Sequence, residues 1–398
     1  MAAEWRVRPL GEIAVFKNRL RVPLSAAQRD ERSGTFPYWG ANGPLDTIDD
    51  YLFNEPNVLV AEDGTVIRAD GRAVVHWVQG KYWVNNHAHV LGVGDDYSLR
   101  WLYYALLSAQ VRSLVSGSVQ PKLSMGSLRR LPLQVPGYHE QEAIVSVLEA
   151  FDDKIESNRR LAIRSEEVWL GVATRALTVA EEVPVAQLIE QGVLTIGDGY
   201  RAKNSELLSE GVPFLRAGNL TGSGVTIGDA DLLPFTALER VGPKRSRPGD
   251  TVFTSKGTVG RITFLGQESE PMIYSPQVCF WRTNEPSRLS CHVLHAWMRS
   301  PRFVSQVNAV KGQTDMADYV SLRDQRTMFF DLPEPRAQGE VDAVATPLAR
   351  QAEVARAEAQ TLSWLRDALL PKLISGRIRI PLSGDVEEQV GVAVEALT

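Results

Sequence analysis

The chain has 398 residues, of which 44% are hydrophobic, and a formal net charge of −5 at pH 7. This length gives room for two domains of ordinary size, and the hydrophobic content is enough for each domain to have a core. No run approaches 18 uncharged apolar residues, and Met1 is not followed by an apolar leader, so we expect neither a membrane span nor a secretory signal. Two cysteines, Cys279 and Cys291, make no disulfide framework, which predicts a cytoplasmic protein.

Basic residues are gathered in two short runs, although the chain as a whole is acidic. A negative net charge taken alone argues against nucleic-acid binding, because Lys and Arg usually neutralise the phosphates. Two interpretations of the runs stay open, a solvated loop and a contact with DNA. The runs are Arg6, Arg8, Lys17, Arg19 and Arg21, and Arg240, Lys244, Arg245 and Arg247.

The sequence contains the same pattern twice. The apolar segment 57–66, which enters a Gly-Thr-Val turn, has a counterpart at 250–259, and the upstream segment 37–41 corresponds to 213–217. Each copy continues with a helical stretch, a Gly-led polar loop, a strand that ends in Pro and a long charged helix. A period this long predicts duplicated domains and excludes a solenoid of short repeats.

This duplication predicts an α+β fold with two globular domains in tandem, separated by two long antiparallel coiled-coil helices. The predicted boundaries are a first domain at 1–135, a central helix at 136–180, a second domain at 181–332, a distal helix at 333–380 and a C-terminal tail at 381–398.

Both long helices show 4-3 spacing of apolar or small residues, which is typical of a coiled-coil seam. Two seams from two copies of one unit would pack antiparallel, with Asn158 fixing their register. A helix of about 35 residues spans on the order of 50 Å, so the pair suits a spacer between readers of two separated DNA half-sites. Dimerisation or simple stabilisation is the alternative. The first predicted seam is Ile144, Leu148, Phe151, Ile155, Asn158, Ala162, Ser165, Trp169, Val172 and Ala176, and the second is Val344, Leu348, Gln351, Ala355, Glu358, Leu362, Leu365 and Leu369.

The common catalytic motifs are missing from this sequence. It has no G-x-x-x-x-G-K-[ST] loop, no HExxH, no GxSxG and no Asp/Asn-Pro-Pro-aromatic tetrapeptide, so we expect no enzymatic activity. His87 and His89 would share one face of a strand, as metal ligands do, but no third ligand is evident, and a polar strand facing a ligand is favoured over zinc. For Cys291, His292 and His295, ordinary helix packing is favoured.

The helices carry motifs of a known family. Leu131-Pro132-Leu133 precedes Glu140-Gln141-Glu142 and the stretch Phe151-Asp152-Asp153-Lys154-Ile155, and Leu365 to Gly376 reads Leu-Arg-Asp-Ala-Leu-Leu-Pro-Lys-Leu-Ile-Ser-Gly. These segments resemble the central and distal conserved regions of the specificity subunit of type I restriction-modification enzymes. The second helix departs from the pattern, because it lacks the Glu-Gln start and is about four residues shorter between its Pro and its Trp.

The globular domains resemble the target recognition domains of that family. The motifs that carry this resemblance are Tyr38-Trp39-Gly40-Ala41-Asn42-Gly43, Trp83-Val84-Asn85-Asn86-His87-Ala88-His89, Gly211-Val212-Pro213-Phe214-Leu215-Arg216 and Pro248-Gly249-Asp250-Thr251-Val252. The resemblance covers the chain from about Trp5 to about Ile380, and the tail from Pro381 matches no known motif.

The resemblance implies a recognition subunit without catalytic activity, whose two domains each read one half of a split, asymmetric double-stranded DNA site. It further implies two methyltransferase subunits that dock on the helices and methylate adenine with S-adenosylmethionine. Motor-nuclease restriction subunits that use ATP and Mg would complete the complex. The chain itself would hold no cofactor and no metal.

Base readout requires Arg or Lys for guanine, Asn or Gln for adenine, and Asp or Glu for cytosine. The duplicated turn offers opposite charges, Glu62-Asp63 in the first copy and Ser255-Lys256 in the second, which suits two different half-sites. The predicted DNA-binding residues are Tyr38, Asn42, Glu62, Asp63, Thr65, Asn85, Asn86, His87, Gln120, Lys122, Tyr200, Arg201, Lys203, Arg216, Asn219, Thr254, Lys256, Thr258, Gln277, Gln313 and Asp315.

Partner docking is predicted on the outer helix faces, with Phe151, Trp169, Trp364 and Leu370 as anchors. An intramolecular core is the alternative for these four residues. Three other functions stay open: an adaptor of a type IIB-like system, a duplicated coiled-coil scaffold without a DNA role, and a metal-dependent hydrolase built around His87 and His89.

Overall fold

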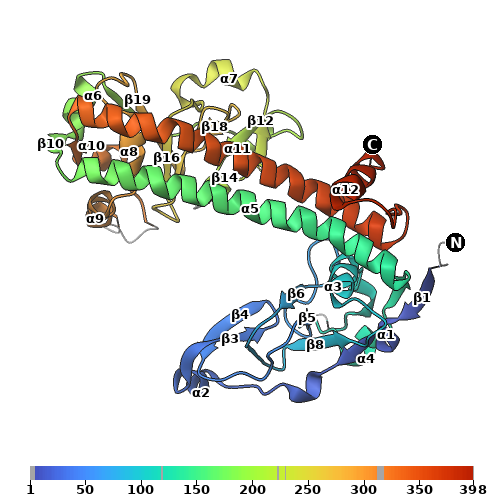
Figure 1. Cartoon of the computed structure of the whole chain (residues 1–398). Coiled ribbons are helices and arrows are strands. Elements are labelled where there is room, and N and C mark those ends of the chain that lie inside the picture. Colours follow the sequence, from blue (N-terminus) through green and yellow to red (C-terminus); the bar gives the residue numbers. More distant parts are fainter. Residues whose placement is uncertain (1–4, 118–119, 222–223, 229, 312–317, 398) are drawn as a thin grey trace. The chain divides into compact units, whose positions relative to one another are not determined.

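The computed structural model describes residues 5–117, 120–221, 224–228, 230–311 and 318–397. Helices and sheets are mixed in it, which confirms the predicted α+β class (Figure 1). The chain divides into two compact units, one formed by 1–155 with 360–398 and the other by 156–359. No described helix combines the length and the apolar character that a membrane crossing requires.

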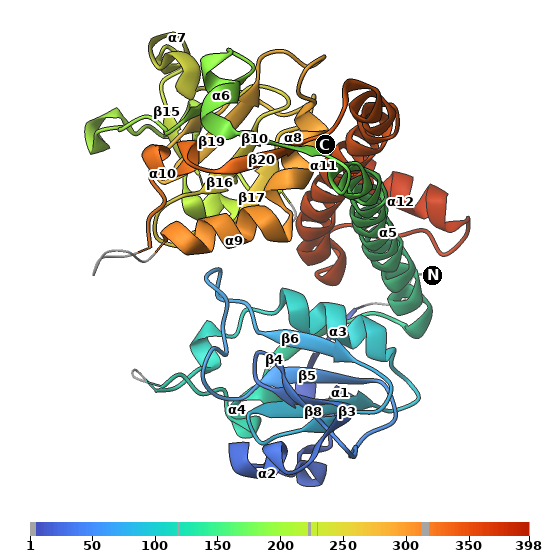
Figure 2. The same cartoon turned by 90° about the vertical axis from the view of Figure 1, so that its left-hand side faces the viewer.

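The first unit contains a globular domain closed by the antiparallel pair β1 (Arg6–Pro9) and β9 (Pro132–Val135). Helix α3 (Leu99–Ser108) lies against β5 and β6 of its larger sheet (Figure 2). The larger sheet has the order β2 (Ala14–Phe16), β8 (Ala88–Val93), β5 (Asn57–Ala61) and β6 (Val75–Val78), and the smaller one β4 (Gly43–Ile48), β3 (Ser33–Gly40) and β7 (Trp83–Val84). Short helices are α1 (Leu10–Ile13), α2 (Ala26–Asp30) and α4 (Met125–Arg129).

The second unit contains a domain closed in the same way by β10 (Glu181–Pro184) and β20 (Phe329–Leu332). Its larger sheet has the order β11 (Leu194–Gly197), β19 (Val278–Thr283), β16 (Thr251–Thr254) and β17 (Ile262–Phe264), and its smaller sheet β15 (Asp231–Leu233), β12 (Val212–Leu215) and β18 (Ile273–Tyr274). Strand β13 (Leu220–Thr221) pairs antiparallel with β14 (Gly224–Val225), and the helices are α6 (Val185–Glu190), α7 (Ala237–Arg240), α8 (Cys291–Met298), α9 (Pro301–Val310) and α10 (Leu322–Arg326).

The strand orders of the two domains confirm the duplication. Each larger sheet is antiparallel with its strands in matching order, and each smaller sheet contains one parallel pair, β3 with β7 and β12 with β18. The Gly-Thr-Val turns match in detail, since Gly64 has φ 80° and Gly257 has φ 81°. This left-handed conformation favours glycine over any other residue. The exact domain boundaries stay a prediction, because the two compact units cut across both long helices.

The long helices α5 (Tyr138–Leu177) and α11 (Pro335–Ile374) have 40 residues each, so the shorter interval between Pro and Trp in the second copy does not shorten its helix. Both helices begin in the same way. Gln141 accepts from the Ser98 amide at 2.9 Å and donates to the Pro136 carbonyl at 3.1 Å. Gln338 accepts from the Ser290 amide at 2.8 Å and donates to the carbonyl of Pro333 at 2.8 Å, so it replaces the missing Glu-Gln start.

The first predicted seam is confirmed, because its residues from Ile144 to Trp169 are buried and its last two are half-buried. In the second predicted seam, every other residue is wrong by one position. Ala352 and Ala359 are buried, whereas Gln351 and Glu358 are exposed. Alanine gives a weak hydrophobic signal, so the predicted seam was placed one residue away from these two buried alanines. The correct seam contains Val341, Ala345, Leu348, Ala352, Ala355, Ala359, Leu362 and Leu369.

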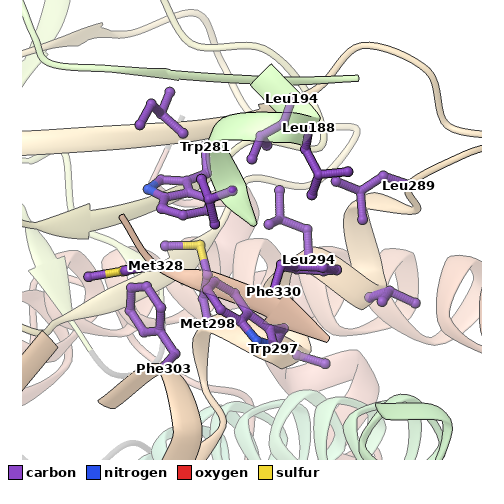
Figure 3. Close-up of a cluster of buried hydrophobic side chains, with 14 of the residues drawn as sticks. Leu188, Leu194, Trp281, Leu289, Leu294, Trp297, Met298, Phe303, Met328 and Phe330 are labelled. Atoms are coloured by element: carbon purple, nitrogen blue, oxygen red, sulfur yellow. The ribbon is translucent and has the colours of Figure 1, made fainter. Parts of the chain in front are cut away.

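Aromatic side chains fill the main core of the second unit (Figure 3). Trp297 lies 4.7 Å from Phe330 and 5.0 Å from Phe303, measured between ring centroids. Trp169 of α5 and Val341 of α11 belong to this core, so the ends of both helices are fixed to the second domain. Such burial stabilises a domain by about 1.5–3 kcal/mol for each large side chain.

Candidate nucleic-acid interface

Ionic side chains meet at the Gly-Thr-Val turn of the first domain. Asp63 is hydrogen-bonded to Nδ1 of His87, whose side chain is 50% exposed. The Lys122 Nζ lies 3.6 Å from Glu62 and 4.0 Å from Asp63. The structure therefore brings together four of the predicted DNA-binding residues, from three separate stretches of the chain.

Arg21 organises this turn and was missing from the predicted site. Its Nη1 donates to the Glu62 carboxylate at 2.8 Å, to the carbonyl of Ala88 at 2.7 Å and to the carbonyl of Asn86 at 3.2 Å. One guanidinium thus connects the turn to the loop that precedes β8. The only sequence signal for Arg21 was its place in the first basic run, where it is the last member.

His89 is buried next to this turn and has no capacity for a metal ion. Its Nε2 donates to the Leu123 carbonyl at 2.8 Å, and its Nδ1 accepts from the Asn18 amide at 2.9 Å. Burial lowers the pKa of His89, which agrees with this neutral ring. Within the described residues no three His, Cys, Asp or Glu side chains come together as a metal site. The proposed hydrolase centre at His87 and His89 therefore has no geometric support.

The turn of the second domain has the same backbone with different side chains. Leu123 donates to the carbonyl of Glu62 at 2.8 Å, as Val320 does to that of Ser255 at 2.9 Å. Ser255 is buried and Lys256 is exposed, and no described residue forms an ion pair with Lys256. The Asp63 position is thus occupied by a lysine in the second domain.

A second matched position lies beside each turn. The Glu62 amide donates to the carbonyl of His87 at 2.8 Å, and the Ser255 amide donates to that of Gln277 at 2.9 Å. Both His87 and Gln277 are exposed. The pair Asp63 and His87 in the first domain therefore corresponds to Lys256 and Gln277 in the second.

Three predicted DNA contacts are corrected by their burial. The Tyr38 hydroxyl accepts from the amide of Leu24 at 2.8 Å, Oδ1 of Asn85 accepts from the amide of His87 at 2.7 Å, and Thr254 Oγ1 donates to the Thr258 carbonyl. Tyr38, Asn85 and Thr254 therefore shape the loops from within and cannot reach a base edge in this conformation.

The remaining candidates differ in exposure. Glu62, Asp63, Tyr200 and Asn219 are half-buried, and Gln313 and Asp315 lie outside the described residues. Tyr200 and Arg240 both bind Glu206, and Arg216 pairs with Asp231 at 2.5 Å, so these two arginines are partly neutralised. The exposed candidates are Asn42, Thr65, Asn86, His87, Gln120 and Lys122 in the first domain, and Arg201, Lys203, Arg216, Lys256, Thr258 and Gln277 in the second.

A basic hairpin follows the turn in the first domain and was also missed. The connection from β5 to β6 has 13 residues (62–74), whereas that from β16 to β17 has seven (255–261). The additional residues form a tight turn in which the amide of Arg68 donates to the Arg72 carbonyl at 2.8 Å. Arg68 is exposed, and Arg112 holds the turn through the Ala69 carbonyl at 3.2 Å. Comparing the lengths of the two copies would have revealed this insertion.

The predicted partner anchors are mostly internal. Phe151, Trp169 and Leu370 are buried, so the intramolecular core accounts for them and corrects their assignment to a partner surface. Trp364 is 68% exposed on α11 and is the one anchor of the four that a partner could contact.

Comparison with known proteins places the fold in context. Residues 2–165 match the family model of the type I restriction modification DNA specificity domain. A candidate type I restriction enzyme specificity subunit of Haemophilus influenzae is 27% identical over 276 residues, which are 67% of this chain and 69% of that protein. Residues 2–165 therefore carry the features of a type I restriction modification DNA specificity domain, and the chain is similar to a specificity subunit over two thirds of its length.

Two further specificity subunits are similar to this chain. The type I restriction enzyme MjaIX specificity subunit of Methanocaldococcus jannaschii is 22% identical over 312 residues, covering 72% of this chain and 70% of its own. The type I restriction-modification system S subunit of M. genitalium superimposes with a TM-score of 0.63 at 15% identity, covering 93% of this chain and 96% of that one. This structural likeness shows that the chain shares the fold of that S subunit, beyond the residues that the family model matches.

Proposed function

We propose that this chain is the non-catalytic recognition subunit of a DNA methyltransferase and restriction complex, in which each domain binds one half of a split, asymmetric DNA site. The observation that carries this proposal is the pair of turns with matching main-chain hydrogen bonds and opposite charge, Asp63 beside His87 in one domain and Lys256 beside Gln277 in the other. An acidic side chain accepts from cytosine and a lysine donates to guanine, so equal backbones would present different base preferences.

The backbone positions of the turns support base readout over a purely structural role. Gly64 donates to the Pro121 carbonyl at 3.2 Å, and Gly257 donates to that of Asp318 at 3.0 Å. Since main-chain bonds hold the backbone of both turns, the side chains at 63 and 256 can differ while the backbone stays the same. Variable side chains on a fixed backbone are what two different half-sites require.

The basic hairpin of the first domain adds phosphate contacts in this proposal. Arg68 is exposed without an ion-pair partner among the described residues, and Arg72 lies 3.5 Å from Asp70, a weak surface pair. Phosphate contacts position a protein on the duplex without reading its sequence. The first domain would therefore bind its half-site with more counterion release than the second.

In the proposed complex, methyltransferase subunits that carry S-adenosylmethionine dock on α5 and α11, and motor-nuclease subunits that use ATP and Mg join them in the cytoplasm. Exposed apolar residues on the helices are candidate contacts for these subunits. Leu161 and Val168 of α5 are 41% and 55% exposed. They lie two helical turns apart on one face, as the anchors of a helix interface do.

The deciding experiment is expression of the chain with its cognate methyltransferase in a methylation-free host, followed by mapping of modified adenines by single-molecule sequencing. We expect one split motif methylated on both strands. A soluble complex that methylates no site would contradict the recognition role, and the absence of any complex would favour a duplicated scaffold. A methyltransferase fused to its nuclease in the genome neighbourhood would indicate the type IIB-like alternative.

A further inference from the structure

The C-terminal tail, which matches no family motif, folds as a cover on the first part of α5. Its helix α12 (Val386–Glu395) is capped by the Asp385 side chain, which accepts from the Glu388 amide at 2.9 Å. Gln389 is buried, and its Oε1 accepts from the Ser146 hydroxyl at 3.0 Å. Upstream of α12, Arg379 binds Glu140 at 3.0 Å. The tail thus runs along one face of α5 within the first unit.

The duplication identifies the corresponding face of α11. Gln141 and Gln338 make the same bonds at the two helix starts, so residue 146 of α5 corresponds to 343 of α11. In α5, Ala143 and Val147 are buried and Ser146 and Ala150 are half-buried. The corresponding residues of α11 are Glu340, Val344, Ala343 and Pro347, of which only Val344 is half-buried and the others are exposed. We call these four residues the open face of α11.

The open face also offers a hydrogen-bond acceptor that a helix normally hides. Pro347 has no N–H, so the carbonyl of Ala343 lacks its usual donor within α11. In α5 the corresponding Ser146 donates its hydroxyl to Oε1 of Gln389, so α12 supplies an acceptor there. On α11 the complementary group is a side-chain donor, which a docked helix would direct at the carbonyl of Ala343.

The cover α12 is held weakly. It has ten residues, fewer than a helix needs to be stable by itself in water. Only Gln389 and Ala393 of it are buried, and Val386 remains 42% exposed. Elements with so few buried apolar contacts open at low free-energy cost.

We propose that the open face of α11 binds an amphipathic helix of a methyltransferase subunit, and that α12 occupies the matched face of α5 until a second such helix displaces it. The inference rests on the proposed function, because it assigns the occupant of the docking surface. The chain itself shows that this face of the duplicated fold accepts an amphipathic helix. Loading of the two faces would then be sequential, α11 first.

The test uses the full chain with its methyltransferase subunit, with binding constants and stoichiometry measured by native mass spectrometry and titration. Pro347→Glu puts a charge on the open face and restores a backbone N–H, so the helix itself is not weakened. We expect it to weaken the first binding step about tenfold or more. Thr346→Glu, the neighbouring exposed position about 100° around the helix, should change it by less than about twofold.

A second variant tests the cover. Gln389→Ala combined with Ala393→Glu should loosen α12 and tighten the second binding step about tenfold without affecting the first. Glu387→Gln, an exposed change on α12, is its control. Weaker binding of either subunit to the loosened variant would overturn the inference, because α12 would then belong to the docking surface.

Other outcomes separate the two levels of the proposal. If the wild-type chain assembles and methylates but Pro347→Glu binds equally well, the open face is not the docking site and only this inference fails. If the isolated chain dimerises and Pro347→Glu abolishes the dimer, the occupant is a second copy and the inference is again wrong. If no wild-type complex forms under any condition, the proposed function fails with it.

Discussion

Lys256→Glu should abolish the contribution of the second half-site and leave the rest of the protein intact. Lys256 is exposed and pairs with no described acidic group, so its replacement should change the free energy of unfolding by less than about 0.5 kcal/mol. A good contact between a side chain and a base edge is worth about 1–3 kcal/mol of discrimination. Reversing the charge should therefore weaken binding of the DNA site by about 5- to 150-fold.

The assay is a thermodynamic cycle on the assembled complex. Dissociation constants are measured for the methylated site and for duplexes with either half scrambled, with both wild type and variant. In the Lys256→Glu complex, scrambling the second half should cost little further, while scrambling the first half should cost as much as in wild type. Strong coupling of this kind identifies a residue with the half-site that it reads.

The result that refutes this reasoning is additivity. If the losses from Lys256→Glu and from scrambling the second half simply add, the turn of the second domain does not read that half. Lys81→Glu, the same charge change at an exposed lysine of the first domain, is the control and should not couple to the second half. Loss of methyltransferase binding would show instead that the turn is structural.

Three further results are expected. Gln141→Ala and Gln338→Ala should each lower the free energy of unfolding by about 1–3 kcal/mol in urea titrations, because each leaves a buried serine amide without its acceptor; a large effect in one copy alone would contradict their equivalence. Thermal stability should peak near pH 6.5. Burial lowers the pKa of His295 to about 3, so below pH 6.5 only the unfolded chain takes up this proton and the folded state loses stability. Despite burial, the hydrogen bond to Asp342 raises the pKa of His292 to about 9. The folded state therefore loses the stabilisation from charged His292 as the pH rises from 6.5 to 9. A flat melting profile from pH 5 to 9 would refute both assignments. Arg68→Gln should reduce the salt slope of DNA binding by about 1 without changing the methylated sequence, and an altered sequence would show that Arg68 contacts bases.

The sequence was sufficient to predict the duplication and the first seam, since both depend on repeated apolar positions. It failed where side chains give a weak pattern. Ala352 and Ala359 form the second seam, but the exposed Gln351 and Glu358 beside them were assigned to it. Alanine is buried there because two helices approach closely, and the periodicity of apolar residues along one helix does not report that approach.

The candidate site was predicted in position but not in the roles of its residues. Asn85 and Thr254 have the right chemistry for base contacts, yet both are buried and bond to nearby backbone. Arg21 was one of five basic residues in a run, and its role depends on three acceptors brought together by the fold. Burial and long-range partners of this kind follow from tertiary packing and leave no local signal.

The two turns should also differ in how easily they evolve. In the second domain, Lys256 makes no ion pair with the described residues, and main-chain bonds together with the Thr254 hydroxyl hold the loop. In the first domain, the Arg21 guanidinium, with 13% of its side chain exposed, ties Glu62 to the loop before β8, and Lys122 approaches both acidic residues. Removing one partner of such a network leaves another group unpaired, which is costlier than changing a solvated lysine. Substitutions at 256 should therefore give new half-site preferences at little cost in stability, whereas changes at 62 need a compensating change at Arg21.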